Sequence, residues 1–168
     1  MPQLSLHTPI GPLTISAEDE AIVAVDWGWG RDQEPTPVLQ AARAWLHRYF
    51  DGAVEAMTLP VAPFGAPYRQ RVWQTICDIP LGATRSYLAI ARLAGGSARS
   101  VGGAMATNPI PILIPCHRVL ASGPRGTLLI GGYSGGEGLE TKQFLLDLER
   151  RVSTGAVHAT FPPAIGMT

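Results

Sequence analysis

The eight residues 112–119, Ile-Leu-Ile-Pro-Cys-His-Arg-Val, are the most informative stretch of this 168-residue chain. We predict a buried strand from Ile110 to Ile114, so that Cys116 emerges where an apolar strand gives way to a polar loop. A free thiol is only a few per cent thiolate at neutral pH, and the adjacent His117 could supply the base that activates it. Cys116 is therefore a candidate nucleophile, although a small buried hydrophobe is the commoner fate of a lone cysteine.

Cysteine and histidine are sparse in the rest of the chain. The second cysteine, Cys77, falls inside a predicted helix before Asp78, and we expect it to be structural. The four histidines are scattered and no C-x-x-C pair is present, so neither a disulfide framework nor a zinc site is predicted. We therefore expect no required metal and no cofactor.

Three short helices are predicted before Cys116. The first covers residues 68–77. Ser86 can cap a second over residues 87–94, which a glycine pair ends, and Ser97 can cap a third that runs to about residue 107. Two short helices joined by a glycine turn have the outline of a DNA-binding helix-turn-helix, which many helical hairpins without a DNA role share.

The first 65 residues predict a different architecture. Apolar and turn residues indicate antiparallel strands at 4–8, 13–16 and 21–27, and helical spacing of apolar residues indicates a helix at 37–50. Residues 59–67 contain three prolines and a glycine, and we interpret them as a stiff linker.

The fold expected from these elements has two lobes. Residues 1–65 would form an α/β N-terminal lobe with a small antiparallel sheet, and residues 66–152 a mostly helical C-terminal lobe containing the helix-turn-helix. The second lobe would end with a glycine-rich loop at 131–136 and a helix from about Gly138 to Arg150. We expect residues 153–168 to form a flexible tail, as termini often do.

Charge divides unevenly along a chain whose net charge is zero. Residues 66–130 carry seven arginines against Asp78 alone, a balance of +6, whereas residues 1–65 balance at −5. A basic stretch of this kind is what phosphate contact requires, and the alternative is an ordinary arginine-rich solvated surface. No apolar run approaches the roughly 18 residues of a membrane-spanning helix and no signal region opens the chain, so we expect a cytoplasmic protein without a membrane partner.

The residues around Cys116 resemble the signature of a known family. Asn108-Pro109, residues 112–119 and the loop 132–136 together are similar to the O6-alkylguanine-DNA alkyltransferases, also called methylated-DNA–protein-cysteine methyltransferases. The Pro-Cys-His-Arg sequence is highly specific to that family, and the resemblance extends over about residues 68–150. The first lobe, ribonuclease-H-like in this family, matches only loosely, through a hairpin at 8–14.

The resemblance implies DNA repair by an irreversible, single-turnover transferase. A methyl or other alkyl group would pass from O6 of guanine to Cys116 once per molecule, because an S-alkyl thioether has no good leaving group. The implied partner is double-stranded DNA that contains O6-alkylguanine, with the target base flipped out of the helix. A monomer without an obligate protein partner is expected.

The resemblance also assigns catalytic roles to five residues. Cys116 matches the acceptor thiol, His117 the group that removes its proton through a water, and Glu149 the carboxylate that orients the imidazole. Tyr87 matches a phenol that donates a proton toward N3 of guanine, and Asn108 a side chain that braces the active-site turn. Without the resemblance, Glu149 would be interpreted as a surface charge and Tyr87 as a core or interface aromatic. Asn108 would be interpreted as part of an ordinary Asn-Pro turn.

Residues of the predicted recognition helix match residues with which the family contacts the minor groove of DNA. Tyr87, which lies outside that helix, also matches a DNA-contacting residue. Arg99 matches the side chain that fills the space left by the flipped base, and Ser97 and Ala98 lie beside it at the helix start. Gly102 and Gly103 would leave a smooth face for close approach to a DNA backbone. The alternatives are a tight helix-packing contact at the two glycines and an ordinary solvated arginine.

The glycine-rich loop resembles the lip of the family's guanine pocket. Tyr133 would pack against the alkyl group or the base, and Ser134 would direct its backbone at O6. Gly135 and Gly136 complete the lip, and main-chain groups near Val119 would read the guanine amino group.

Three other functions remain open at this point. A non-catalytic sensor of alkylated bases would lack the acceptor cysteine, a cysteine hydrolase would turn over repeatedly, and a helix-turn-helix regulator would need an effector or dimerisation segment.

The connection between Val119 and Tyr133 is longer than is usual in the family, and residues 124–129 account for the extra length. The sequence therefore leaves open the accepted size of alkyl group, activity on O4-alkylthymine, cooperativity on DNA and the fate of the alkylated protein.

Overall fold

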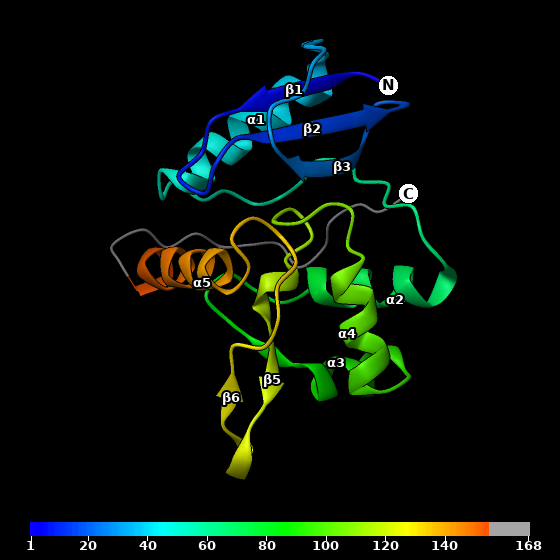
Figure 1. Ribbon diagram of the computed structural model, residues 1–168, viewed down its shortest axis with the longest axis vertical. Coiled ribbons are helices and arrows are strands. Elements are labelled where there is room, and N and C mark those ends of the chain that lie inside the picture. The colour runs from blue at the N-terminus through cyan, green and yellow to red at the C-terminus, as the bar shows by residue number, and fades with distance from the viewer. Residues whose placement is uncertain (155–168) are drawn as a thin grey trace.

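A computed structural model describes residues 1–154. The chain forms two lobes, one stacked above the other, with a small sheet and a helix in the first and a helical body in the second (Figure 1). The predicted flexible tail is wrong for its first two residues, which belong to helix α5 (Leu139–Thr154). The rest of that tail, residues 155–168, lies outside the described residues.

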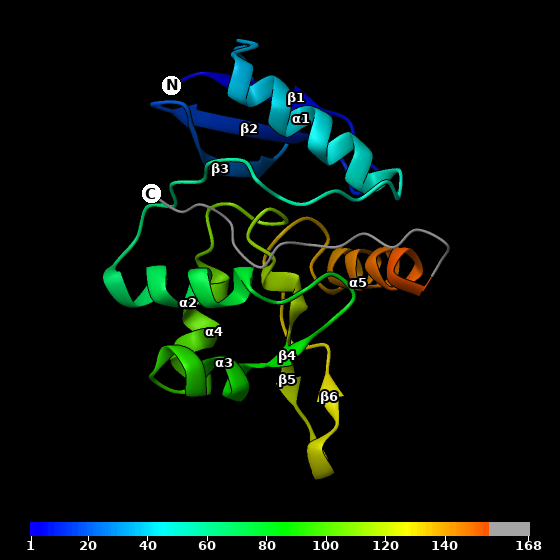
Figure 2. The same cartoon turned by 180° about the vertical axis from the view of Figure 1, so that it is seen from behind.

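The first lobe is a three-stranded antiparallel sheet covered on one face by a helix. Strands β1 (Gln3–Leu6), β2 (Leu13–Glu18) and β3 (Ala21–Trp27) pair in that order, and α1 (Pro37–Phe50) lies across them in Figure 2. Pro37 stands at the start of α1, where its missing N–H would have no helical partner in any case. These strands and this helix confirm the prediction, except that β1 spans Gln3–Leu6 rather than 4–8 and β2 continues to Glu18 rather than ending at Ser16.

The linker between the lobes is irregular but packed. Val61 forms a parallel bridge with Ile22 of β3 and is fully buried. Buried side chains of both lobes belong to one continuous hydrophobic core. The burial of apolar surface therefore holds the two lobes together.

The helices of the second lobe begin within one residue of their predicted starts. They are α2 (Pro67–Cys77), α3 (Tyr87–Ala94) and α4 (Ala98–Ala106). The Ser86 hydroxyl accepts a hydrogen bond from the Ala89 amide at 3.0 Å, and Ser97 and Ser100 form a reciprocal capping box. The glycine pair at 95–96 turns the chain between α3 and α4 with positive φ angles of 94° and 80°. The predicted helix-turn-helix outline is confirmed.

The strand predicted at 110–114 is wrong. The segment forms a tight turn in which the Ile114 amide donates to the Ile110 carbonyl at 2.9 Å and Ile112 has a φ of 73°. Prolines flank and interrupt the segment, and because proline has no N–H the backbone cannot pair as a regular strand. Its isoleucines are buried as expected, and the cysteine opens a short 3-10 turn, Cys116–Arg118.

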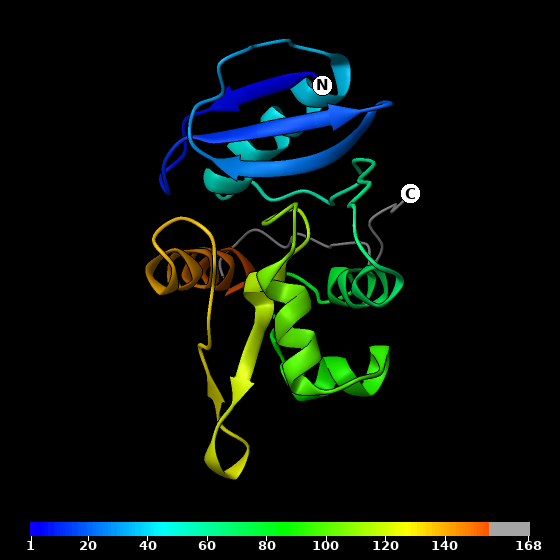
Figure 3. The ribbon, with the colours of Figure 1, turned by 45° about the vertical axis from the view of Figure 1, so that its right-hand side comes forward.

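A β-hairpin projects from the second lobe. Strand β5 (Val119–Ser122) pairs in parallel with the short β4 (Arg85–Ser86) and antiparallel with β6 (Leu128–Leu129). The turn at Pro124–Gly126 joins β5 to β6, and the hairpin points away from the first lobe in Figures 1 and 3. The extra length noted at 124–129 forms the outer part of this hairpin.

Helix α5 begins directly after Gly138, as predicted, and continues past its predicted end at Arg150. It packs beside the 3-10 turn that contains the cysteine. Within residues 1–154 no helix is long and apolar enough to cross a membrane. No group of three or more His, Cys, Asp or Glu in the same range could hold a metal ion.

Candidate active site and DNA-binding face

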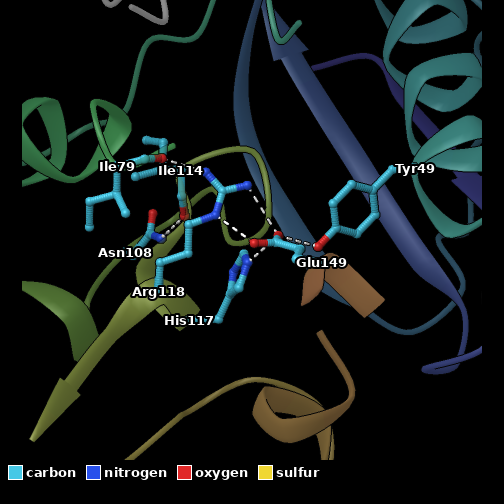
Figure 4. A network of polar contacts seen from close by, with 7 residues as sticks. All are labelled: Tyr49, Ile79, Asn108, Ile114, His117, Arg118 and Glu149. Atoms are coloured by element: carbon cyan, nitrogen blue, oxygen red, sulfur yellow. Dashed lines mark hydrogen bonds and ion pairs between the residues drawn. The ribbon is translucent and has the colours of Figure 1, made fainter. Parts of the chain in front are cut away.

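A buried carboxylate, that of Glu149 on α5, lies at the centre of the polar network in Figure 4. His117 Nε2 lies 2.6 Å from Glu149 Oε2, and Arg118 Nε lies 2.7 Å from Oε1. The hydroxyl of Tyr49, on α1 of the first lobe, donates to the same Oε2 at 2.5 Å. All four side chains are buried, where hydrogen bonds to a charge are strong. One carboxylate therefore links both lobes.

Arg118 compensates the buried negative charge. Its Nη2 donates to Glu149 Oε2 at 3.1 Å, in addition to the Nε bond, and its Nη1 donates to the Ile79 carbonyl at 2.8 Å. Burial would raise the pKa of the Glu149 carboxyl, but the charges and hydrogen bonds of His117 and Arg118 outweigh it and hold this pKa well below its usual range. Glu149 is therefore ionised at neutral pH, and Arg118 belongs to the interior rather than to the basic surface.

The His117 ring directs one nitrogen at Glu149 and leaves the other on the opposite side. An ionised carboxylate only accepts hydrogen bonds, so this contact places the proton of a neutral imidazole on Nε2 and the lone pair on Nδ1. Nδ1 is buried and has no hydrogen-bond partner among residues 1–154. A ring held in this tautomer can accept a proton at Nδ1.

Cys116 borders a pocket with a volume of about 220 Å³. Burial raises the pKa of its thiol, and a hydrogen bond from Asn108 and the charge of Lys142 offset only part of that rise. The resting thiol is therefore protonated at neutral pH and needs a base before it can act as a nucleophile. The pocket is lined by Tyr87, Gly102, Met105, Ala106, Cys116, Gly132, Tyr133 and Ser134.

Asn108 holds the turn that precedes the cysteine. Its Nδ2 donates to the Ile114 carbonyl at 2.9 Å, and its Oδ1 accepts from the Ile110 amide at 3.0 Å. These two bonds span the segment whose strand prediction failed. They fix the backbone two residues before Cys116.

Tyr87, the first residue of α3, forms one wall of the pocket. Burial, followed by the charge of an ionised Cys116, raises the pKa of its phenol, so the hydroxyl keeps its proton at neutral pH. Lys142 lies behind this wall, with Nζ 5.9 Å from the centre of the Tyr87 ring and hydrogen-bonded to the carbonyls of Val119 at 2.7 Å and Gly132 at 3.1 Å. Burial lowers the pKa of Lys142 to about 8. Val119 is fully buried and does not line the pocket.

The predicted lip of the pocket divides into two parts. Tyr133 and Ser134 line the pocket, whereas Gly135 and Gly136 face the first lobe. A β-carbon added at Gly135 would lie 2.5 Å from the Trp27 ring, and one at Gly136 would lie 2.8 Å from Trp27 Nε1. Trp27 also meets the Tyr133 ring edge-on, with 6.3 Å between the ring centres. The end of β3 therefore supports the lip from the side of the first lobe, and the close approach requires glycine.

The start of α4 presents an open surface. Arg99, Ser97 and Ala98 are exposed there. A β-carbon added at Gly102 or Gly103 would meet no atom within 4 Å, so these glycines do not form a helix-packing contact within the described residues. Because Gly102 also lines the pocket, the open face of α4 adjoins the pocket mouth.

Comparison with known families covers both lobes. The DNA-binding domain of 6-O-methylguanine DNA methyltransferase matches residues 67–151, and the ribonuclease-like domain of the same enzyme matches residues 4–63. This chain belongs to the 6-O-methylguanine DNA methyltransferase family. The resemblance predicted from the sequence is therefore confirmed.

Relatives of this methyltransferase cover most of its length. The constitutive methylated-DNA–protein-cysteine methyltransferase of Bacillus subtilis is 37% identical over 157 residues, which are 86% of this chain and 92% of the relative. The Haemophilus influenzae methylated-DNA–protein-cysteine methyltransferase is 38% identical over 155 residues, 85% of this chain and 83% of the relative. Among solved structures, Mycobacterium tuberculosis OGT in complex with DNA matches with a TM-score of 0.78 and 34% identity, covering 90% of this chain and 94% of that one. The two-lobed fold is confirmed.

Four residues that contact the methyltransferase's site residues were missed by sequence reasoning. Tyr49 and Trp27 carry no local signal, because each has the pattern of an ordinary core aromatic. Arg118 was counted as a surface charge, because arginines are mostly exposed and no local pattern marks the one that is buried and paired. Lys142 is the only lysine of the chain and lies three residues before the buried Leu145, a spacing that places it on the buried face of α5.

Proposed function

We propose that this chain repairs DNA by moving an alkyl group from O6 of guanine in duplex DNA to Cys116 Sγ, once per molecule. The observation that carries the proposal is a buried thiol at the edge of a pocket of about 220 Å³, directly before a histidine that is paired with a buried carboxylate. The family membership supports the same chemistry, because its relatives are methylated-DNA–protein-cysteine methyltransferases.

His117 is the base for the thiol proton. The pKa of the Cys116 thiol is raised by burial, so the proton must leave as the carbon–sulfur bond forms. Nδ1 of His117 is the free acceptor on the ring, and a water between it and the thiol would relay the proton. Glu149 holds the ring in the required tautomer, and Tyr49 and Arg118 are positioning residues that hold Glu149.

The transfer balances one bond formed against one bond broken. The thiolate sulfur attacks the alkyl carbon, the carbon–O6 bond breaks, and its electron pair stays with the guanine. Tyr87 would donate a proton toward N3 of that guanine, and the thiol proton restores the phenol through solvent. The net change is an alkyl group on sulfur and a proton on guanine, and the thioether has no leaving group for a second step.

The open face of α4 carries the DNA. The Cys116 sulfur lies inside a pocket, so O6 of a guanine stacked in a duplex cannot reach it, and the base must be rotated out. Gly102 and Gly103 leave room for the minor groove beside the pocket mouth, and Arg99 is exposed at the helix start to fill the vacated stack. No protein partner is required by this arrangement, and we propose a monomer that binds duplex DNA containing O6-alkylguanine.

Intact-protein mass spectrometry tests the proposal. The chain is incubated with an excess of duplex DNA containing O6-methylguanine, and the adduct is mapped by proteolysis. We expect one added methyl per chain, at Cys116, and no further increase with time. The Cys116→Ala variant should gain no methyl group.

Cys77→Ala is the matched control for this experiment. Burial raises the pKa of the Cys77 thiol to about 12, so this cysteine is unreactive and its loss should leave the adduct unchanged. Tight binding of the lesion without any adduct would refute the transferase and favour a sensor of alkylated bases. Repeated turnover of a small ester by the unmodified chain would instead favour a cysteine hydrolase.

A further inference from the structure

The β5–β6 hairpin is a prominent surface element that the alkyl transfer itself does not use. It extends from Val119 to Leu129, packs against α3 through β5, and projects away from the first lobe in Figures 1 and 3. Two adjacent leucines on its outer strand, Leu128 and Leu129, are 44% and 52% exposed. The outer strand of the hairpin therefore leaves part of its apolar surface open to a partner.

The root of the hairpin is fixed to the wall of the pocket. Strand β5 pairs with β4, so that Val119 lies opposite Arg85 and Leu120 opposite Ser86, which caps the helix that begins with Tyr87. At the other root, a β-carbon added at Gly131 would lie 3.3 Å from the Tyr87 hydroxyl. The position of the hairpin is therefore fixed relative to the pocket, and so relative to any DNA that places a base there.

The tip of the hairpin holds an arginine in an unusual conformation. Arg125 has a φ of 58° and a ψ of 33°, the left-handed region that glycine or asparagine normally occupies. The turn around it is closed by the Gly123 amide, which donates to the Thr127 carbonyl at 2.6 Å. Within residues 1–154 no carboxylate forms an ion pair with Arg125, which is exposed. An exposed arginine held in a strained backbone conformation is a candidate functional residue.

Charge identifies the partner. Between Asp78 and Glu137 the sequence contains no acidic residue. The exposed charges of this segment are therefore all positive, and they belong to Arg85, Arg92, Arg99 and Arg125. Four exposed arginines on a segment without a carboxylate fit a polyanion.

We propose that the hairpin is a second DNA-contacting element, in which Arg125 pairs with a backbone phosphate of the bound duplex. The inference rests on the proposed function, because it takes the same duplex as the partner. The contact adds affinity and orientation for the duplex and takes no part in the bond-making step.

Three variants at one position test the proposal. Binding of Arg125→Gly, Arg125→Lys and the unchanged chain to a lesion-containing duplex is measured by fluorescence anisotropy over a range of salt concentrations. In Arg125→Gly, the loss of one phosphate contact should reduce the slope of log K against log salt by about 0.9 and weaken binding several-fold at low salt. In Arg125→Lys, most of the slope and most of the affinity should be kept. Arg125→Gly should also raise the thermal midpoint, since glycine relieves the left-handed strain.

Rates of methyl transfer separate this inference from the proposed function. Arg125→Gly should keep the maximal single-turnover rate at saturating duplex and need several-fold more DNA to reach half of it. The matched control is Arg43→Ala, which removes one arginine from α1 of the first lobe and should leave the salt slope unchanged. A slope for Arg125→Gly equal to that of the unchanged chain would overturn the hairpin contact while the transferase stands. Failure of the unchanged chain to take up a methyl group would instead refute the proposed function.

Discussion

The buried network around Glu149 and the open face of α4 would serve the proposed reaction in opposite ways. Around Glu149, polar side chains from both lobes are packed so that the carboxylate is fully bonded by His117, Arg118 and Tyr49. On α4, two glycines leave empty space. A catalytic base requires a fixed tautomer and therefore rigid, saturated hydrogen bonds, whereas a groove-binding helix requires room. Substitutions in the two regions should accordingly change stability in opposite directions.

The largest expected effect comes from removing the buried carboxylate. Glu149→Ala leaves the charge of Arg118 buried without its counter-charge and the His117 Nε2–H without its acceptor, which should lower the free energy of unfolding by about 3–5 kcal/mol. Urea denaturation measures this loss, and methyl transfer should also slow sharply. Glu140→Ala, in the exposed first turn of the same helix, is the control and should cost less than about 1 kcal/mol. Equal losses in both variants would show that the network does not hold the lobes together.

Acid should weaken the network through the same carboxylate. Its pKa in the folded protein lies below the value of about 4.3 expected in the unfolded chain, so the unfolded chain takes up the proton first as the pH falls. The stability from Glu149 is therefore present above that pH and is lost progressively from about pH 5 downward. Urea unfolding between neutral and acid pH should show a shallower decline for Glu149→Gln than for the unchanged chain. If the free energy of unfolding declined equally in both proteins, Glu149 would not be the group that makes the fold sensitive to acid.

A smaller effect is expected from the link contributed by the first lobe. Tyr49→Phe removes one hydrogen bond to an ionised, buried oxygen and nothing else, which should cost about 1.5–3 kcal/mol of unfolding free energy. The pH dependence of the transfer rate should also shift, because Tyr49 shares Oε2 with His117. Tyr68→Phe, whose hydroxyl bonds on the exposed surface, is a control with little effect on either measurement. An unchanged pH dependence of the transfer rate in Tyr49→Phe would show that the Tyr49–Glu149 hydrogen bond contributes to stability and not to the action of His117.

The smallest expected effect is an increase in the free energy of unfolding, whereas the preceding substitutions should lower it. Gly103→Ala fills open space on α4 and improves helix propensity, so the free energy of unfolding should rise by about 0.5–1 kcal/mol. The added methyl group would stand on the proposed DNA-binding face, so the affinity for duplex DNA should fall, which fluorescence anisotropy would measure. A gain in stability without a loss of affinity would remove Gly103 from the DNA-binding face.

Local features were predicted well because their causes are local. Ser86 and Ser97 cap the helices that follow them, and the glycine pair at 95–96 turns the chain, since a hydroxyl within three residues of an amide and a residue free to take positive φ are enough. The strand predicted at 110–114 failed for a reason also visible in the sequence. Apolar residues there satisfied the pattern, but the prolines removed the donors that a strand needs.

The sequence by itself determined the family signature around Cys116, the candidate roles of His117 and Glu149, and the order of most helices and strands. Only the tertiary structure decided what surrounds them. Tyr49 meets Glu149 across 100 residues of chain, and Trp27 of the first lobe supports the lip of the pocket in the second. Such contacts have no sequence spacing of their own, because they arise where two separately patterned lobes share one core, and that packing fixes the partners.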